Sequence, residues 1–203
     1  STHYLTSIMK TTREATSASI SAGSGAYNAQ WHPRVTKIEN IIYDVGTSTS
    51  LSSTMTMDYD GTTSLSAPLN PTITKQYGFS TTIGSLGSLE KSVETQYLSN
   101  STYDAKNLRS LPSALITRDA STNKKAQSTI SYDDSGYGVS GKIGFPTRTL
   151  NYYDIANSLY VDSWMTYDVY GNVTGVKDGR GNVSTVTFDS TYHTYPVSTT
   201  SPV

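Results

Sequence analysis

YDVYGNVTGVKDGRGNVSTVTFD, residues 167–189, carries the motif Asp-x-x-Gly-Asn-Val twice, beginning at Asp168 and at Asp178. Gly171 and Gly181 take the fourth position of the two copies, and glycine is the residue that most easily adopts a positive φ. An aspartate at the first position of a turn can accept a backbone N–H two residues later, which holds the turn before strands pair. The sequence therefore predicts successive turns of an antiparallel meander, with strands of roughly six residues.

The composition favours an all-β chain with few residues to fill a core. Of the 203 residues, 35% are hydrophobic, and the aromatic residues are 16 Tyr against 3 Phe and 2 Trp. Tyrosine and threonine suit a half-exposed pleated sheet. The net charge of -1 gives no general field for nucleic acid, and no apolar run approaches the roughly 18 residues of a membrane helix. We therefore expect no nucleic-acid partner and no membrane span in this segment.

Alternation of residue types predicts strands in several places. Residues 159–167, 126–132 and 55–59 alternate with period two, and each run ends on a tyrosine followed by aspartate. The segment RVTKIENIIYDVG, residues 34–46, fits a helix or a strand, and its β-branched residues favour the strand. We expect residues 1–75 to be an irregular Ser/Thr-rich β segment with loops such as SASISAGSGAYNAQ and TTSLSAPLNP, and residues 76–203 to form a YD-repeat β-sheet segment. The change between them is gradual, so the two are expected to form one continuous structural unit.

A Tyr-Asp-x-x-Gly/Asn pattern recurs along the second half of the chain. Its last position always carries a residue that tolerates a left-handed backbone, which fits a hairpin turn with a bulge. Asp58 to Gly61 and Asp178 to Gly181 add two Asp-x-x-Gly turns. The predicted structural residues, all in turns or at strand ends, are Tyr103, Asp104, Asn107, Tyr132, Asp133, Gly136, Tyr153, Asp154, Asn157, Tyr167, Asp168, Gly171, Asp178, Gly181, Phe188 and Asp189.

These residues resemble the YD repeat of the RHS-repeat family, which includes bacterial toxin-complex and RHS toxin shell proteins and teneurin-like relatives. The stretches LRSLPSALITRDASTNKKAQSTISYDDSG and TFDSTYHTYPVSTTSPV are similar to the segments between its repeats, and the resemblance covers about residues 98–203. It implies a spiralling β-shell around a toxin or other cargo polypeptide, of which this chain would be a fragment. It also implies a secreted or cell-surface protein whose partners are other shell segments and the enclosed polypeptide. The sequence lacks the family's terminal motif, so no catalytic residue is carried over.

Other candidate sites are weaker. Gly136, Gly141 and Lys142 imitate a phosphate-binding loop, but Ile143 stands where a hydroxyl is needed, and a hairpin is the better interpretation. A calcium loop beginning at Asp58 lacks its bidentate glutamate. His3, His32 and His193 show no metal-ligand spacing. The sequence thus predicts no enzyme, metal or cofactor, although a carboxylate pair formed only in the fold stays open.

Two further expectations concern the surface. Asn100, Asn172 and Asn182 lie in glycosylation sequences. They are acceptors if the protein is secreted through an endoplasmic reticulum, and they are turn residues in a bacterial protein. Tyrosine-rich sheet faces could stack sugars, so a carbohydrate-binding or adhesion module is the alternative function, against cross-strand packing of the tyrosines with their hydroxyls at the wet edge. Unpaired edges of such a sheet would favour pairing with other chains.

Overall fold

The computed structural model describes residues 5–22, 25–44, 49–60, 69–134 and 143–202. Within them lie twelve strands and one short helix, so the prediction of an all-β antiparallel chain is confirmed. No helix in these ranges is long and apolar enough to cross a membrane. The elements are β1 (Leu5–Ala22), β2 (Gly25–Asp44), β3 (Thr49–Tyr59), β4 (Pro71–Ser80), β5 (Leu89–Tyr97), α1 (Ser101–Asp104), β6 (Pro112–Asp119), β7 (Lys124–Tyr132), β8 (Pro146–Asp154), β9 (Leu159–Tyr167), β10 (Val173–Lys177), β11 (Val183–Phe188) and β12 (Pro196–Thr200).

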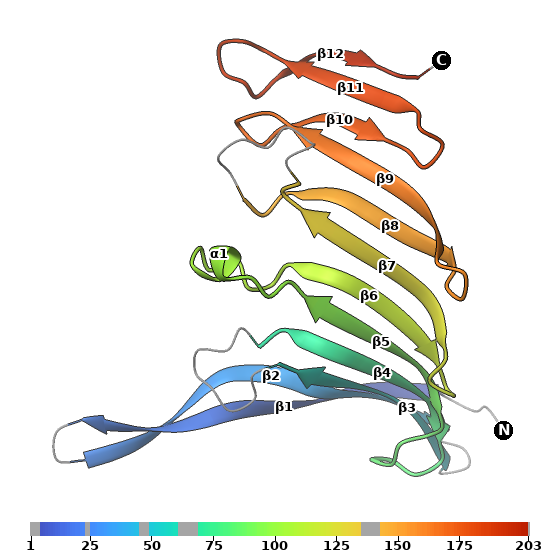
Figure 1. Ribbon diagram of the computed structural model, residues 1–203. Coiled ribbons are helices and arrows are strands. Elements are labelled where there is room, and N and C mark those ends of the chain that lie inside the picture. Colours follow the sequence, from blue (N-terminus) through green and yellow to red (C-terminus); the bar gives the residue numbers. More distant parts are fainter. Residues whose placement is uncertain (1–4, 23–24, 45–48, 61–68, 135–142, 203) are drawn as a thin grey trace. The chain divides into compact units, whose positions relative to one another are not determined.

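The order of the strands in the sheet follows their order in the sequence, from β1 to β12 (Figure 1). This is the meander that the alternation and the turn motifs predict. The chain divides into two compact units. Unit 1 holds Ser1–Thr95 and Thr117–Lys124, and unit 2 holds Gln96–Ile116 and Lys125–Val203. The predicted change of character near residue 75 concerns composition and stays a prediction.

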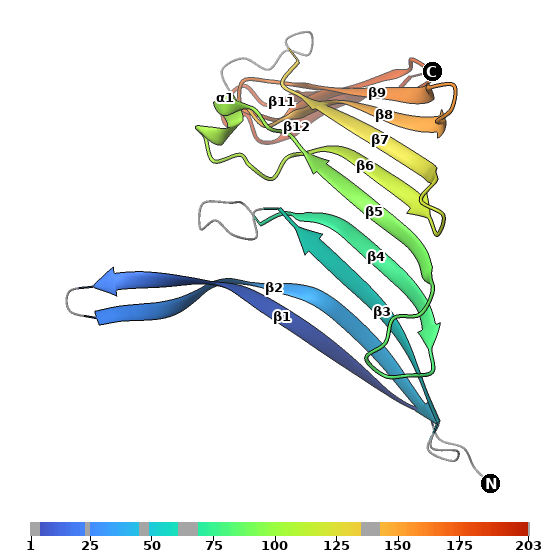
Figure 2. The same cartoon turned by 60° about the horizontal axis from the view of Figure 1, so that its bottom comes forward.

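Unit 1 begins with a long hairpin of β1 and β2, drawn in blue in Figure 2. Strand β3 pairs with β2 only from Lys37 to Asp44, so the distal part of the hairpin extends beyond that pairing. The segment 34–44 is strand, as its β-branched residues predict. The prediction of an irregular loop over 17–30 is wrong: residues 17–22 and 25–30 belong to β1 and β2. Backbone pairing within the hairpin outweighs a Ser/Ala/Gly-rich composition.

The interior of unit 1 contains a buried carboxylate. Glu39 is 2% exposed beside Ile41, which is 3% exposed. The loop between β4 and β5 reaches this glutamate, because the Gly84 N–H donates to Glu39 Oε1 at 2.6 Å and Lys37 Nζ donates to the Gly84 carbonyl at 3.0 Å. Burial alone would raise the pKa of Glu39, but the Gly84 N–H and the charge of Lys37 lower it. Glu39 and Lys37 thus attach the loop between β4 and β5 to the sheet.

Unit 2 has a thin core. Ala114, Ile116 and Tyr167 are buried, and Thr147 is fully buried at 0% exposure. The Phe145 ring lies 4.9 Å from the ring of Tyr167, which adds aromatic area to the same core. Thr147 and Tyr167 lie where β8 begins and β9 ends. The turns at Asp133, Asp168 and Asp189 lie at this end of the strands, and those at Asp119, Asp154 and Asp178 lie at the other end.

Candidate functional site: the aspartate-clamped turns

The turn at Asp168 shows how one carboxylate fixes a turn. The Asp168 N–H donates to the Asn172 carbonyl at 3.1 Å, and Asp168 Oδ1 accepts the N–H groups of Tyr170 and Asn172, both at 2.9 Å. The second carboxylate oxygen accepts Asn172 Nδ2 at 2.9 Å. Gly171 has a φ of 92° and lies between these contacts. Asn172 is therefore occupied by turn contacts, which explains its place in the repeated motif.

The turn at Asp178 has the same construction. Its carboxylate accepts the N–H of Arg180 at 2.9 Å, the N–H of Asn182 at 2.8 Å and Asn182 Nδ2 at 2.8 Å. The Asp178 N–H donates to the Asn182 carbonyl at 2.9 Å, and Gly181 has a φ of 91°. The two motif copies in the sequence are thus two copies of one hydrogen-bonded turn.

A third turn of this type was missed from the sequence. Asp119 accepts the N–H groups of Ser121 and Asn123, both at 2.9 Å, and donates its own N–H to the Asn123 carbonyl at 3.0 Å. Thr122 takes the left-handed position, with a φ of 68°. The aspartate follows Arg118 and not an aromatic residue, and threonine is uncommon at positive φ. The asparagine four residues after the aspartate is the signal that would have found it.

Longer loops are fixed by the same reciprocal contact, which we call the aspartate clamp. In it, the aspartate N–H donates to the carbonyl of the residue immediately before the next strand, and the aspartate carboxylate accepts the N–H of that same residue. Asp133 clamps Phe145 in this way at 2.9 and 3.0 Å, and Asp189 clamps Tyr195 at 2.9 Å in both directions. The sequence separation is 12 (145−133) in one case and 6 (195−189) in the other. The clamp therefore does not depend on loop length.

Unit 1 contains a clamp that corrects one prediction. The carboxylate of Asp60 accepts the Asn70 N–H at 2.7 Å, and the Asp60 N–H donates to the Asn70 carbonyl at 3.0 Å. Asp58, predicted to open an Asp-x-x-Gly turn, instead lies within β3 and forms an ion pair with Lys75 at 3.0 Å. Strand β3 continues through Tyr59, so Asp58 is still a strand residue and its side chain meets Lys75 of the neighbouring strand β4.

Tyrosines that end strands donate their hydroxyls to the backbone of the preceding strand. Tyr132 donates to the Pro112 carbonyl at 2.9 Å, and Tyr167 donates to the Pro146 carbonyl at 2.8 Å. Burial raises the pKa of both tyrosines. Phe188 ends β11 without a hydroxyl. At Tyr132 and Tyr167 the aromatic residue thus ties two neighbouring strands, while the aspartate that follows it ties the loop.

A proline followed by a hydroxyl residue completes the pattern on the next strand. Tyr132 pairs with Pro146, and the register then shifts by one residue, which leaves Thr147 as the extra residue of a bulge. The Thr147 hydroxyl donates to the Ser131 carbonyl at 3.3 Å. Equivalent hydroxyl bonds of 3.3 Å follow two other prolines, from Thr72 to the Asp58 carbonyl and from Ser113 to the Gln96 carbonyl. Sequence reasoning missed these Pro-Thr and Pro-Ser pairs.

The Tyr103-Asp104 pair lies in a helix, contrary to the predicted hairpin turn. Asn100 caps α1 by accepting the Thr102 N–H at 2.9 Å. Asn107 does take the left-handed position, with a φ of 59°, but it ends a helical turn whose carbonyls at Tyr103 and Asp104 accept the next backbone N–H groups. The asparagine cap outweighed the turn motif because it satisfies the free N–H groups of a helix.

The hydroxyl of Tyr103 contacts a second predicted residue, Asp133. It donates to Asp133 Oδ2 at 2.7 Å, and the same carboxylate accepts the Gly144 N–H at 2.6 Å. Burial and the Asp133 carboxylate raise the pKa of Tyr103 to about 12. Asp133 itself has a left-handed backbone, with a φ of 54°. Gly136, the predicted left-handed residue of this turn, lies outside the described residues.

At Asp154 the left-handed residue of the turn comes one position later than predicted. The carboxylate accepts the Asn157 N–H at 3.1 Å and Asn157 Nδ2 at 2.8 Å, three residues after the aspartate and not the predicted two. The left-handed residue is Ser158, with a φ of 55°, and not Asn157. Asparagine is used here for its side-chain amide, which lowers the pKa of Asp154. Tyr153 precedes this turn and is 69% exposed.

Neighbouring turns of unit 2 contact one another. A β-carbon added to Gly171 would lie 2.9 Å from Cζ of Phe145, so the turn at Asp168 lies close to the aromatic ring that ends the preceding loop, at Asp133. Asn172 Nδ2 donates to the His193 carbonyl at 2.7 Å, and the rings of Tyr170 and His193 stack 4.0 Å apart. We call the three turns at Asp133, Asp168 and Asp189, with these contacts, the turn ladder.

Hydrogen bonds lower the pKa of Asp168, Asp178 and Asp189. At Asp168 burial alone would raise the pKa, but the amide and N–H of Asn172 and two further backbone N–H groups lower it. At Asp178 the Asn182 side-chain amide is the largest cause of a lowered pKa. At Asp189 backbone N–H groups, that of Tyr192 first, hold the pKa far below its ordinary value of 3.8. These turns therefore favour the ionised carboxylate.

The lowered pKa values of these aspartates predict that the folded chain loses stability in acid. A carboxylate with a lowered pKa in the folded state contributes stability above its unfolded pKa, and that stability is lost as the pH falls through the folded pKa. We expect the urea midpoint to stay level above about pH 5 and to fall below about pH 4. Asp189→Asn should flatten that fall, because the neutral side chain has no proton to gain. Equal acid slopes for the wild type and the variant would contradict the role of Asp189.

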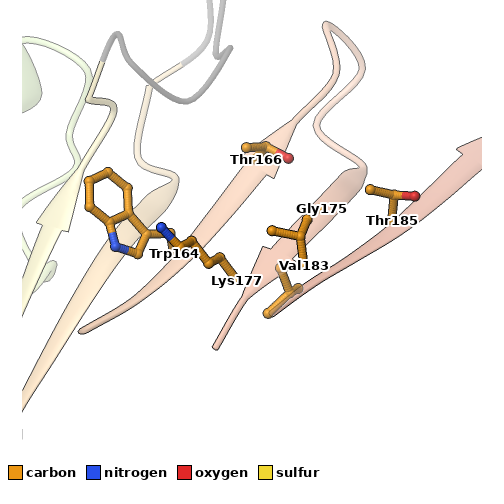
Figure 3. A pocket seen from close by; sticks show the side chains of 7 residues that line it. Trp164, Thr166, Gly175, Lys177, Val183 and Thr185 are labelled. Carbon is orange, nitrogen blue, oxygen red and sulfur yellow. The ribbon is translucent and has the colours of Figure 1, made fainter. Parts of the chain in front are cut away.

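A shallow pocket of about 370 Å³ lies between β9, β10 and β11, and Figure 3 shows Lys177 directed toward the indole of Trp164 in it. Lys177 Nζ lies 5.8 Å and the Arg148 guanidinium 4.8 Å from that ring. Arg148 also forms a two-point ion pair with Asp162, at 3.0 and 2.8 Å, and this lowers the pKa of Asp162. The indole of Trp164 is thus close to two cations, Lys177 within the pocket lining and Arg148 outside it.

The described ranges contain no group of three or more His, Cys, Asp or Glu residues that could hold a metal ion. The phosphate-loop imitation at residues 136–142 lies outside those ranges. The sequence matches no protein-family profile and no curated protein. The resemblance to RHS repeats therefore stays a prediction from the residues, and the clamp geometry is the main observation on which a function can be argued.

Proposed function

We propose that this chain is a structural, non-catalytic wall segment of a secreted or cell-surface RHS/YD-repeat protein. Its sheet would belong to a β-shell that separates a toxin or other cargo polypeptide from proteases and from the producing cell. The partners would be neighbouring shell segments and the enclosed polypeptide. The observation that carries the proposal is the aspartate clamp, which closes the ends of short turns and long loops with the same contact.

The physical argument concerns access to the backbone. A protease must open a segment locally before it can bind it in an extended form, so exposed but hydrogen-bonded turns resist cleavage. The Asp178 carboxylate accepts three hydrogen bonds within its turn although the turn is exposed. A wall built from such turns has few points at which digestion can start.

Trypsin tests this argument at one bond. Arg180 lies within the Asp178 turn, and we expect trypsin to cleave slowly after it in the native chain. The rate of this cleavage is measured by mass spectrometry. Asp178→Ala removes the acceptor of the Arg180 and Asn182 N–H groups, so cleavage there should become several-fold faster. Asp168→Ala is the matched control, because it opens a different turn and should leave cleavage after Arg180 unchanged. Native cleavage as fast as that of the free peptide 173–188 would contradict the proposal.

An exposed aromatic patch supports the alternative of carbohydrate binding. Tyr170, Tyr192 and Tyr195 are 52%, 73% and 64% exposed, and they lie on the turns at Asp168 and Asp189. The Tyr192 and Tyr195 rings meet edge to face at 6.4 Å. Exposed aromatic rings on a fixed backbone can stack on the apolar face of a sugar. The candidate surface is therefore on turns as well as on sheet faces.

A glycan array separates this alternative from the wall function. If the patch binds sugars, Tyr192→Ala should abolish saturable binding to the glycans recognised by the wild type. Tyr153→Ala is the control, because Tyr153 is equally open at 69% exposure but lies in β8 outside the patch. An array without saturable binding to the wild type would reject the alternative and leave the wall proposal intact.

A further inference from the structure

Strand β12 is the last strand of the sheet and has one free edge. All five residues of β12 are exposed, and Val197 is 64% exposed. The strand pairs with β11 from Thr185 to Phe188, and no other described strand pairs with it. A row of unpaired N–H and C=O groups on such an edge is a template for an added strand.

Two even-numbered strands of the same unit show what lies beside an equivalent edge. Strand β6 opens on Pro112 and strand β8 opens on Pro146. The strand that follows each of them in the sequence ends in a tyrosine, Tyr132 or Tyr167, whose hydroxyl donates to the proline carbonyl at 2.9 or 2.8 Å. The proline carbonyl is thus a recurring acceptor for the strand-terminal tyrosine of the next strand.

Strand β12 opens in the same manner. Pro196 pairs with Phe188 as Pro146 pairs with Tyr132, and a register shift follows in both cases. The clamp before the proline is also the same, since Asp189 holds Tyr195 by two hydrogen bonds of 2.9 Å. No tyrosine of the described part of the chain donates to the carbonyl of Pro196. The Pro196 carbonyl is therefore placed like the carbonyls of Pro112 and Pro146, but no strand-terminal tyrosine of the described residues donates to it.

We propose that the edge of β12 binds an antiparallel polypeptide strand that ends in Tyr-Asp, with the tyrosine hydroxyl donating to the carbonyl of Pro196. The inference rests on the proposed wall function, because it names the kind of strand that extends the wall at this edge. Pairing of β12 with the β12 of a second copy fits less well. The segment Pro196–Thr200 contains no tyrosine whose hydroxyl could donate to the Pro196 carbonyl of a second copy.

A peptide with the sequence of residues 159–168, LYVDSWMTYD, is the probe, because in the chain this segment places Tyr167 against Pro146. It is added to the complete 203-residue chain, and hydrogen exchange of the backbone amides is followed by NMR. We expect saturable protection of amides in residues 197–200. The matched peptide with Tyr167→Phe keeps the strand and removes the hydroxyl, so its affinity should be about five- to tenfold lower.

Three results would overturn the inference. They are no protection of residues 197–200 by the peptide, equal affinity of the two peptides, or protection that rises with protein concentration when no peptide is present. The last would mean that two copies pair through β12. None of these depends on trypsin resistance at Arg180, so failure of the edge inference and failure of the wall function are separate outcomes.

Discussion

Gly171→Ala should destabilise the chain by about 2–4 kcal/mol, and Gly181→Ala by about 1–2 kcal/mol, in urea denaturation at neutral pH. Both glycines have the same backbone, with φ of 92° and 91°, so the cost of a side chain at positive φ is shared. They differ in what a β-carbon would meet. At Gly171 it would lie 2.9 Å from the Phe145 ring, whereas at Gly181 the nearest atom is Lys177 Cε at 3.8 Å.

The difference between the two variants isolates the contact between turns. A second variant, Phe145→Leu, shortens the side chain that meets Gly171, so it should recover part of the loss when combined with Gly171→Ala. The two changes would then show a favourable coupling energy in a double-mutant cycle. Equal losses for both glycine variants, or additive effects with Phe145→Leu, would mean that the turn ladder does not constrain Gly171.

Local chemistry explains which parts of this fold were predictable. The turns at Asp168 and Asp178 close over four residues, so the spacing of aspartate and glycine was enough to predict them. The all-β meander followed from alternation that ends at Tyr-Asp pairs. The clamp between Asp133 and Phe145 was not predictable, because its two ends are twelve residues apart (145−133) and Phe145 carries no turn signal.

Competition between local motifs explains the wrong predictions. Tyr103-Asp104 has the same letters as the other pairs, but Asn100 before it caps a helix and Asn107 after it ends one. At Asp154 the asparagine serves as an amide donor, which transfers the left-handed backbone to Ser158. A sequence shows that asparagine favours a turn, but the contacts of its side chain decide which of the two roles it takes.

Asp133→Ala should cost about 2–4 kcal/mol, because it leaves three donors without their acceptor. Those donors are the N–H groups of Gly144 and Phe145, at 2.6 and 3.0 Å, and the Tyr103 hydroxyl at 2.7 Å. Tyr103→Phe removes only the last of these bonds and should cost about 1 kcal/mol. Asp134→Ala changes the net charge by the same amount at the neighbouring position and should have a smaller effect than Asp133→Ala.

Alkaline titration gives Asp133 a second readout. The pKa of Tyr103 is raised to about 12 by burial and by the Asp133 carboxylate. A raised pKa contributes stability that is complete below the unfolded value of 10.0 and is lost as the pH rises through the folded value. The advantage of the wild type over Asp133→Ala in urea midpoint should therefore narrow above about pH 10. An advantage that stays constant through this range would show that Asp133 acts on the Gly144 and Phe145 backbone alone, without the Tyr103 hydroxyl.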